Sequence, residues 1–200
     1  MSKPKIGIIV GSIREGRFAD KPVEWIASIA KARGDLDIEI IDLRDYPMPL
    51  FAEAIPPSYA PPKNDVARKW GAKIEELDGF IVTAAEYSHG PTAALKNAID
   101  YAGTEWNRKP ASFVGYGGVG GARAVEQLRM IAVEMQMAPT RAAVHILWPD
   151  YLSVQQGKNL AEIDHLNQAA AAMLDDLAWW AKVLKTARDN DAATASVKAA

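Results

Sequence analysis

The sequence predicts an α/β fold, with one doubly wound parallel sheet of five strands and helices on both of its faces. Short apolar runs rich in β-branched residues alternate with longer amphipathic stretches from residue 5 to residue 147. The short runs are mostly continuous in hydrophobic residues, as expected for parallel strands that are covered on both faces. No change in composition along the 200 residues is long enough to form an interdomain linker, so a single domain is expected.

The predicted strands and helices follow one another in regular alternation. The strands are expected at residues 5–10, 38–42, 79–84, 111–116 and 142–147. The stretches between them carry hydrophobic residues at helical spacing, as Ile26, Ile29 and Ala30 do. They predict helices at 19–33, 66–77, 92–102 and 122–137, followed by a last long helix at 161–188. We expect one domain over residues 1–188 and a flexible tail over residues 189–200, which are small and polar.

Charge and composition exclude several classes of function. The chain has 23 basic and 25 acidic side chains, a net charge of −2, so no long-range field would attract nucleic acid or an acidic membrane. Its apolar runs are far shorter than the ~20 residues of a membrane span, and no signal peptide is expected. Because the chain has no cysteine, it offers no thiolate metal site or thiol nucleophile. Redox chemistry would need a borrowed cofactor, and a cytoplasmic location is expected.

Three loops form the candidate site, because ligands of doubly wound sheets bind at the carboxyl ends of the strands. These loops follow the first, third and fourth predicted strands. The loop after the second strand, residues 43–65, contains six prolines, which favour a stiffened excursion over the surface. This segment would lie near a partner subunit, at the rim of the site, or simply in solvent.

The first loop, residues 11–18, suits a phosphate. It leads directly into a helix, whose exposed N–H groups and positive dipole end attract anions, and Ser12, Arg14 and Arg17 add a hydroxyl and two charges. Its glycines have the separation found in a P-loop, but Arg17 and Phe18 stand where the Lys and Ser/Thr of that motif would be. A phosphate monoester is therefore the better fit, and a tight turn with surface arginines is the alternative.

The fourth loop is rich in glycine. Residues 115–120 match the dinucleotide fingerprint of glycines at the first, third and sixth positions. The acidic partner of that fingerprint should end the next strand, whereas Glu134 lies inside a predicted helix. Four glycines within residues 117–121 let the backbone approach a flat ligand closely and turn N–H groups toward it. The alternative is again a tight turn.

The third loop, residues 85–91, combines an acid, an aromatic ring, a hydroxyl and an imidazole at a strand end. These groups belong to Glu86, Tyr87, Ser88 and His89. Since no nucleophile motif or acidic orienting residue accompanies His89, a contact role is preferred to that of a general base, with chance surface placement as the alternative. The other two histidines lack metal-ligand spacing, and no metal site is expected.

Taken together, the three loops resemble the NAD(P)H-dependent FMN reductase family of flavodoxin-like proteins, which includes flavin, quinone, azo-dye and chromate reductases. The resemblance covers roughly residues 5–185 and is carried by GSIR at 11–14, by EYSHG at 86–90 with LKNAIDY at 95–101, and by the glycine loop. Two positions depart from the family pattern. Ala85 stands where proline is usual, and Ala19 stands near where many members have a polar residue at the phosphate.

The resemblance implies a flavodoxin-like sheet in the order 2-1-3-4-5 and a bound FMN. Residues of the first loop would surround the phosphate, and those of the third and fourth loops would line the ribityl chain and the isoalloxazine ring. The implied cofactor-binding residues are Ser12, Arg14, Arg17, Phe18, Glu86, Tyr87, Ser88, His89, Tyr116, Gly117, Gly118 and Gly121. No catalytic side chain is expected, because FMN carries the hydride chemistry and the protein positions it.

The function expected from this resemblance is the transfer of hydride from NADPH or NADH to FMN, and of electrons onward to a small-molecule acceptor such as a quinone, free flavin, azo compound or chromate. A homodimer or homotetramer is implied as well. A flavodoxin-type electron carrier is one alternative, although such carriers are strongly acidic and this chain is not. An NAD(P)-dependent Rossmann dehydrogenase is the other. The sequence leaves open the acceptor and the choice between NADPH and NADH.

Overall fold

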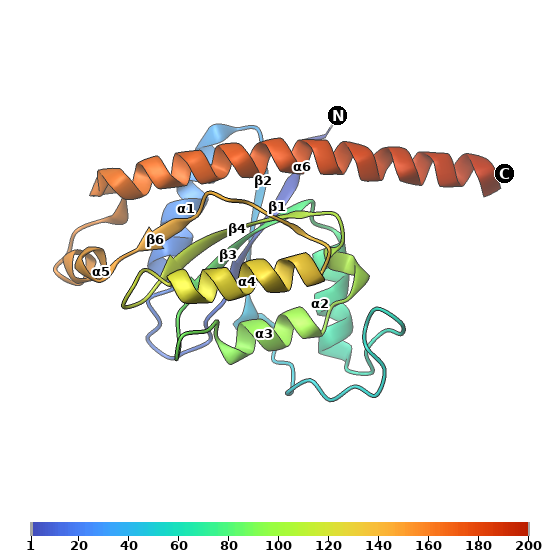
Figure 1. Cartoon of the computed structure of the whole chain (residues 1–200), viewed down its shortest axis with the longest axis horizontal. Coiled ribbons are helices and arrows are strands. Elements are labelled where there is room, and N and C mark those ends of the chain that lie inside the picture. The colour runs from blue at the N-terminus through green and yellow to red at the C-terminus, as the bar shows by residue number, and fades with distance from the viewer. Residues whose placement is uncertain (1, 200) are drawn as a thin grey trace.

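The computed structural model describes residues 2–199, and side chains from residue 2 to residue 194. A twisted parallel sheet lies between two layers of helices (Figure 1). The strands are β1 (Lys5–Val10), β2 (Asp37–Asp42), β3 (Gly79–Ala85), β4 (Pro110–Tyr116), β5 (Ala138–Pro139) and β6 (Val144–Ile146). The helices are α1 (Asp20–Arg33), α2 (Asp65–Glu75), α3 (Ala93–Asp100), α4 (Ala122–Glu134), α5 (Trp148–Gln155) and α6 (Asp164–Ala199). The strand order β2-β1-β3-β4-β5 confirms the flavodoxin-like topology.

The edge of the sheet beside β4 differs from the prediction, because two short strands replace one. Instead of one strand at 142–147, two short strands pair with β4: β5 near its start and β6 near its end. Between them the buried hydroxyl of Thr140 lies 2.8 Å from that of Ser112 and donates to the carbonyl of Ala142. A side chain that bonds to its own backbone competes with the strand ladder, so the chain leaves the sheet here and rejoins it.

Three helices also differ from the prediction. Helix α4 ends at Glu134 rather than at residue 137, because Gln136 adopts a left-handed φ of 54°. Helix α5 was not predicted. Helix α6 begins later than expected and continues past residue 188 to Ala199, so that its end projects beyond the sheet in Figure 1. The flexibility expected of residues 189–200 stays a prediction, and residue 200 lies outside the described residues.

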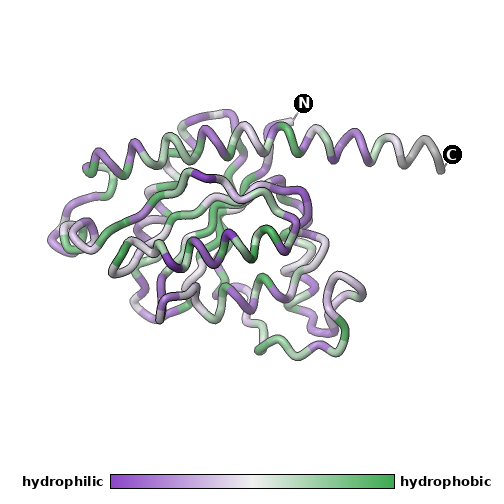
Figure 2. The backbone as a smooth tube through the Cα atoms, viewed as in Figure 1, coloured by the Kyte–Doolittle hydropathy of each residue, from purple (hydrophilic) through white to green (hydrophobic). Residues whose placement is uncertain are grey.

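The core consists of two hydrophobic layers, one on each face of the sheet. Helices α1 and α6 cover one face, where Ile26 and Leu177 are fully buried. Helices α2, α3 and α4 cover the other, where Trp70 and Phe113 are fully buried. Burying an aliphatic or phenyl side chain of this kind stabilises the folded state by roughly 1.5–3 kcal/mol. Figure 2 shows the result, with hydrophobic strands at the centre and mixed helices around them.

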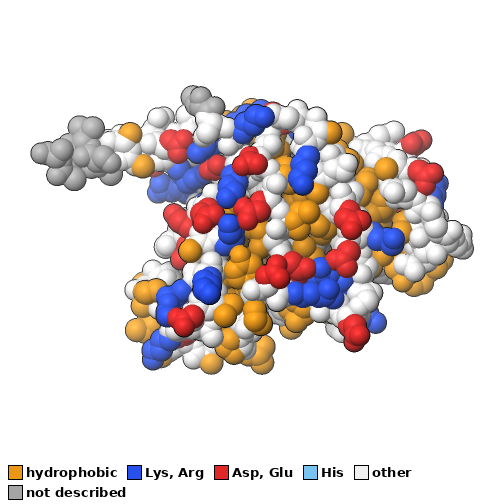
Figure 3. All heavy atoms as spheres, turned by 180° about the vertical axis from the view of Figure 1, so that it is seen from behind, with side chains coloured by type: hydrophobic (Ala, Val, Ile, Leu, Met, Phe, Trp, Pro, Cys, Tyr) orange, Lys and Arg blue, Asp and Glu red, His pale blue; other side chains and the backbone are white. Residues whose placement is uncertain are grey.

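The surface carries charges of both signs. From behind, acidic and basic side chains are interspersed over the face shown in Figure 3. The proline-bearing loop after β2 is tied to α3, because Asn97 accepts from the Phe51 backbone and donates to the Pro49 carbonyl, both at 2.8 Å. No helix among the described residues is long and apolar enough to cross a membrane.

Candidate cofactor site

A cleft of about 560 Å³ opens at the carboxyl ends of β1, β3 and β4. Its walls come from the loops after these strands, the first turn of α1 and one face of α5. It is lined by Ser12, Arg14, Gly16, Arg17, Phe18, Lys21, Ala85, Glu86, Tyr87, Tyr116, Gly117, Trp148, Tyr151 and Gln155. Eight of the predicted site residues are in this set. Ser88, His89, Gly118 and Gly121 are not, although they belong to the same loops.

The N-terminus of α1 faces this cleft without a side-chain cap. Ala19 occupies the N-cap position and has no side chain that could accept a hydrogen bond. By contrast, Asn64 caps α2 and Thr92 caps α3. Within this first turn Lys21 donates its N–H to the Phe18 carbonyl and Pro22 has none, so the terminus offers an anion chiefly the positive end of the helix dipole and the N–H of Asp20. Beside them, the exposed side chain of Arg14 has no hydrogen-bond or ion-pair partner among the described residues.

Arg17 does not have the free charge that the sequence analysis expected. Its guanidinium forms a two-pronged pair with Asp42, contacts Asp20, and donates to the Ser12 carbonyl at 2.7 Å. Its side chain is only 6% exposed. These bonds, above all the one with Asp42, raise the pKa of Arg17 above its ordinary value. Although Arg17 lines the cleft, it joins the first loop to the end of β2, and Arg14 is the arginine that is free to bind a ligand.

Glu86 also has a different role from the one expected. Its carboxylate, 3% exposed, accepts from the Arg123 backbone at 3.0 Å and from the Arg123 Nε at 2.6 Å. Burial works to raise the pKa of Glu86, but the bonds from Arg123 outweigh it and the pKa lies below its ordinary value. Glu86 therefore caps the N-terminus of α4, whose own N-cap residue, Gly121, has no side chain to do so.

The third loop forms a tight turn that presents Tyr87 to the cleft. Tyr87 and Gly90 exchange backbone hydrogen bonds at 2.9 and 3.0 Å. Ser88 and His89 lie between them at φ values of 50° and 69°, a conformation unusual for residues other than glycine. The turn directs His89 toward Arg123 at 2.8 Å, away from the cleft, while the Tyr87 hydroxyl lies 3.1 Å from that of Ser12. The first and third loops are thereby joined across the site.

The fourth loop needs its glycines for the fold. At Gly121, with φ 70°, an added Cβ would lie 2.6 Å from the Tyr116 nitrogen, and Gly117 has a φ of 151° that only glycine adopts readily. Gly118 is open, since nothing lies within 4 Å of its Cβ position. The loop lines the cleft at Gly117, and there it exposes backbone rather than side chains to a ligand.

One buried polar atom in the cleft wall has no partner. The Tyr116 hydroxyl makes no hydrogen bond, although the residue is only 8% exposed. Burial raises the pKa of this hydroxyl well above its ordinary value, so it keeps its proton and remains a donor. Such an orphaned group is costly by about 1–3 kcal/mol unless a ligand satisfies it.

Helix α5 supplies an aromatic wall that the sequence analysis missed. Trp148 and Tyr151 stack at 5.0 Å and 22°, and Tyr151 also meets Phe18 edge-to-face at 5.0 Å. Trp148 is 51% exposed. Pro149 in the first turn and Gly157 after the end, at φ 100°, are ordinary start and stop signals that could have revealed this short helix.

These features fit a phosphorylated aromatic cofactor. An open helix N-terminus beside Arg14 suits a phosphate, the Tyr116 hydroxyl suits a polar chain, and the glycine loop facing aromatic side chains suits a flat ring. No cluster of three or more potential metal ligands occurs among the described residues. Fold and site together define a flavodoxin-like protein that holds a flavin mononucleotide.

Comparison with known proteins gives the family. A model of the NADPH-dependent FMN reductase family matches residues 4–147. An NAD(P)H-dependent FMN reductase of Schizosaccharomyces pombe is 36% identical over 145 residues, which cover 70% of this chain and 72% of that protein. A 2-hydroxy-1,4-benzoquinone reductase of a Burkholderia species is 28% identical over 140 residues, 66% of this chain and 72% of that protein. The chain belongs to the NADPH-dependent FMN reductase family, and is an oxidoreductase that uses FMN and NAD(P)H.

Solved structures agree with this fold. A flavoenzyme NAD(P)H:(acceptor) oxidoreductase of Paracoccus denitrificans superimposes with a TM-score of 0.69 at 20% identity, covering 87% of this chain and 97% of that one.

Glu134 ends α4 rather than a strand. The acidic residue that the dinucleotide fingerprint requires is therefore missing from this position, which disfavours the Rossmann alternative.

Proposed function

We propose that this chain binds FMN in the cofactor cleft and passes electrons from NAD(P)H to a quinone. The observation that carries the site is the uncapped N-terminus of α1 beside the unpaired Arg14. The quinone is suggested by relatives named for it, among them the benzoquinone reductase above. Bound FMN would supply the redox chemistry, and the chain's own residues would bind and orient it.

Each wall of the cleft has its own role in this proposal. Arg14, the positive end of the α1 dipole and the Ser12 hydroxyl would hold the phosphate. The Tyr116 hydroxyl would donate to the phosphate or to the ribityl chain. Tyr87 and the backbone beside Gly117 would lie along the ring. No side chain of the chain needs to exchange a proton.

The assembly and location of the protein are part of the same proposal. Met130 and Val133 on α4 are exposed, and such apolar side chains suit a contact between subunits of a homodimer or homotetramer. A cytoplasmic location accords with the absence of cysteine. Mass measurement in solution and cell fractionation test these two points.

One experiment tests the proposed activity. The purified protein, loaded with FMN, is mixed with NADPH and then NADH without oxygen, and its absorbance is recorded before and after a benzoquinone is added. We expect the flavin absorbance near 450 nm to bleach and then return. An FMN-bound protein that neither coenzyme bleaches would instead behave as a flavodoxin-type carrier. A protein that binds no FMN would contradict the proposal altogether.

A further inference from the structure

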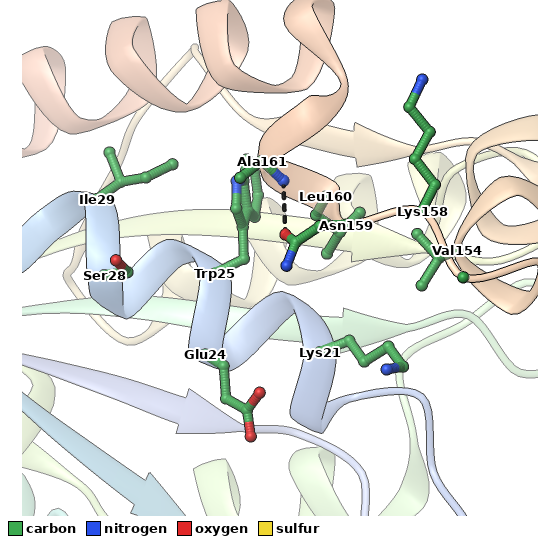
Figure 4. A pocket seen from close by; sticks show the side chains of 11 residues that line it. Lys21, Glu24, Trp25, Ser28, Ile29, Val154, Lys158, Asn159, Leu160 and Ala161 are labelled. Atoms are coloured by element: carbon green, nitrogen blue, oxygen red, sulfur yellow. Dashed lines mark hydrogen bonds between the residues drawn. The ribbon is translucent and has the colours of Figure 1, made fainter.

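A second cavity, of about 390 Å³, is lined by residues of α1 and of the segment after α5 (Figure 4). It lies between the outer side of α1 and the segment that follows α5. Lys21 lines both hollows, and the neighbouring residues Val154 and Gln155 line one hollow each. The two hollows therefore meet at the first turn of α1 and the end of α5. A ligand that leaves the cleft along the end of α5, at Gln155, can continue past Val154 into the second cavity.

The second cavity combines positive charge with an apolar floor. Lys21 on α1 and Lys158 on the facing segment contribute two ammonium groups, and neither has an ion-pair partner among the described residues. Glu24 contributes the one acidic group. The lining therefore has a net charge of +1 on a chain whose total is −2. Cationic groups around a small hollow favour a phosphate-bearing ligand.

The floor and the polar rim suit an aromatic base and its sugar. Val154 and Leu160 are buried at the bottom, beside the edge of Trp25. Asn159 lies beside Leu160 in Figure 4, where its carbonyl oxygen accepts from the Ala161 nitrogen at 2.9 Å and its amide N–H groups remain available. Concave sites with an apolar floor and few polar groups are typical of small-ligand binding.

We propose that this cavity binds the adenosine-phosphate half of NAD(P)H. The inference rests on the proposed function, because the nicotinamide must reach the flavin in the cofactor cleft. The other half of the coenzyme must then leave the cleft at its rim, and the end of α5 leads from there into a hollow with the charge and the apolar lining that this half requires. Lys158 and Lys21 would attract its phosphates, and the base would lie against the apolar part of the lining.

The test uses the FMN-loaded full chain and two donors. NADPH carries the adenosine-phosphate half, and reduced nicotinamide mononucleotide lacks it. The variant Lys158→Glu reverses a charge that lines the second cavity but not the cofactor cleft. We expect its kcat/KM to fall about tenfold with NADPH, through KM, and less than twofold with the truncated donor. Lys69→Glu, an exposed lysine on α2, is the matched control, and it should alter neither value.

A steric variant and a direct binding measurement complete the test. Ser28→Trp, from the α1 side, fills the hollow without changing its charge, and it should raise the KM for NADPH in the same selective way. Calorimetry with ADP-ribose should show binding to the FMN-loaded wild type, weakened about tenfold by Lys158→Glu.

Two results separate the failure of this inference from failure of the proposed function. If both donors bleach the flavin and both variants affect them equally, or if ADP-ribose binds Lys158→Glu as tightly as wild type, the adenosine-phosphate half lies elsewhere and the inference is wrong. If neither donor bleaches FMN bound to the wild-type protein, the proposed function fails first.

Discussion

The two ends of the sheet differ in how far their polar groups are hydrogen-bonded within the chain. At the amino end, Asp78 accepts from Arg188 at 2.6 Å and from the Lys5 backbone at 2.9 Å. The buried ammonium of Lys109 donates to the carbonyls of Ile74 and Glu75 at 2.9 and 3.0 Å, at the C-terminus of α2. Groups there are satisfied by the chain itself.

At the carboxyl end, several groups are left open. Helix α1 has no side-chain cap, the Arg14 side chain has no hydrogen-bond or ion-pair partner among the described residues, and the Tyr116 hydroxyl is buried without a hydrogen bond. Since folded proteins rarely leave such groups unmet, the contrast indicates that the open groups serve a ligand and the paired ones serve stability. Substitutions of paired groups and of open groups should therefore separate stability from cofactor binding.

The largest effect is expected at the amino end, from the titration of Lys109. Burial lowers its pKa from 10.5 to about 8. Between these values the unfolded chain binds the proton and the native chain does not, so stability rises with pH. The free energy of unfolding should gain about 3 kcal/mol across this window, and Lys109→Met should lose the gain.

Urea unfolding of both proteins from pH 7 to pH 10 measures this gain. FMN affinity at pH 7 is the companion measurement, and it should be the same in Lys109→Met and wild type. A variant that keeps the pH-dependent gain would show that Lys109 does not titrate there. A loss of FMN affinity would break the division between the two ends.

Two arginines in the first loop should behave differently although they are three residues apart. Arg17→Met leaves Asp42 partly buried without its partner, and should cost about 2 kcal/mol of stability. Arg14→Met should leave the stability of the apo protein within about 0.5 kcal/mol of wild type. It should nevertheless weaken FMN binding about tenfold or more, because a charge-assisted bond to the phosphate is lost. Urea unfolding without FMN and fluorescence titration with FMN give the two quantities, and equal behaviour of the two variants would contradict this assignment.

The smallest effect is expected at Tyr116, where the two quantities should change in opposite directions. Tyr116→Phe removes a buried hydroxyl that has no partner, so the apo protein should gain about 1 kcal/mol of stability. The same change should weaken FMN binding about fivefold, because a donor to the cofactor is lost. Thermal unfolding with and without FMN checks both signs. A variant that is less stable without FMN would mean that the hydroxyl has a partner within the fold.

Much of the fold could be predicted from the sequence because it depends on local patterns. The continuous apolar runs located β1 to β4 within one residue at each end, and the loops at their carboxyl ends did form the cleft. The divided last strand could not be predicted, since it depends on the contact between Thr140 and Ser112, which are distant in sequence. The continuation of α6 beyond residue 188 was missed because small polar residues are as typical of frayed ends as of helices.

The roles of single site residues were harder to predict because they depend on tertiary partners. The sequence shows that Arg17 and Glu86 lie in candidate loops. It does not show that Arg17 would pair with Asp42, or Glu86 with Arg123. In both cases a charge expected to meet the cofactor holds two elements together. The aromatic wall of α5 lies beyond the last predicted strand. Trp148 and Tyr151 were therefore outside the three loops from which the site was predicted.

In the proposed complex the open groups at the N-terminus of α1, with Arg14 beside them, hold the phosphate of FMN. Riboflavin has the same ring and ribityl chain without the phosphate, so the ratio of the two affinities isolates this contact. Fluorescence titration of wild type and Arg14→Met with FMN and riboflavin measures it. We predict that wild type prefers FMN by at least about 100-fold and that Arg14→Met loses most of this preference. Equal affinity of the wild-type protein for FMN and riboflavin would show that these groups do not bind the phosphate.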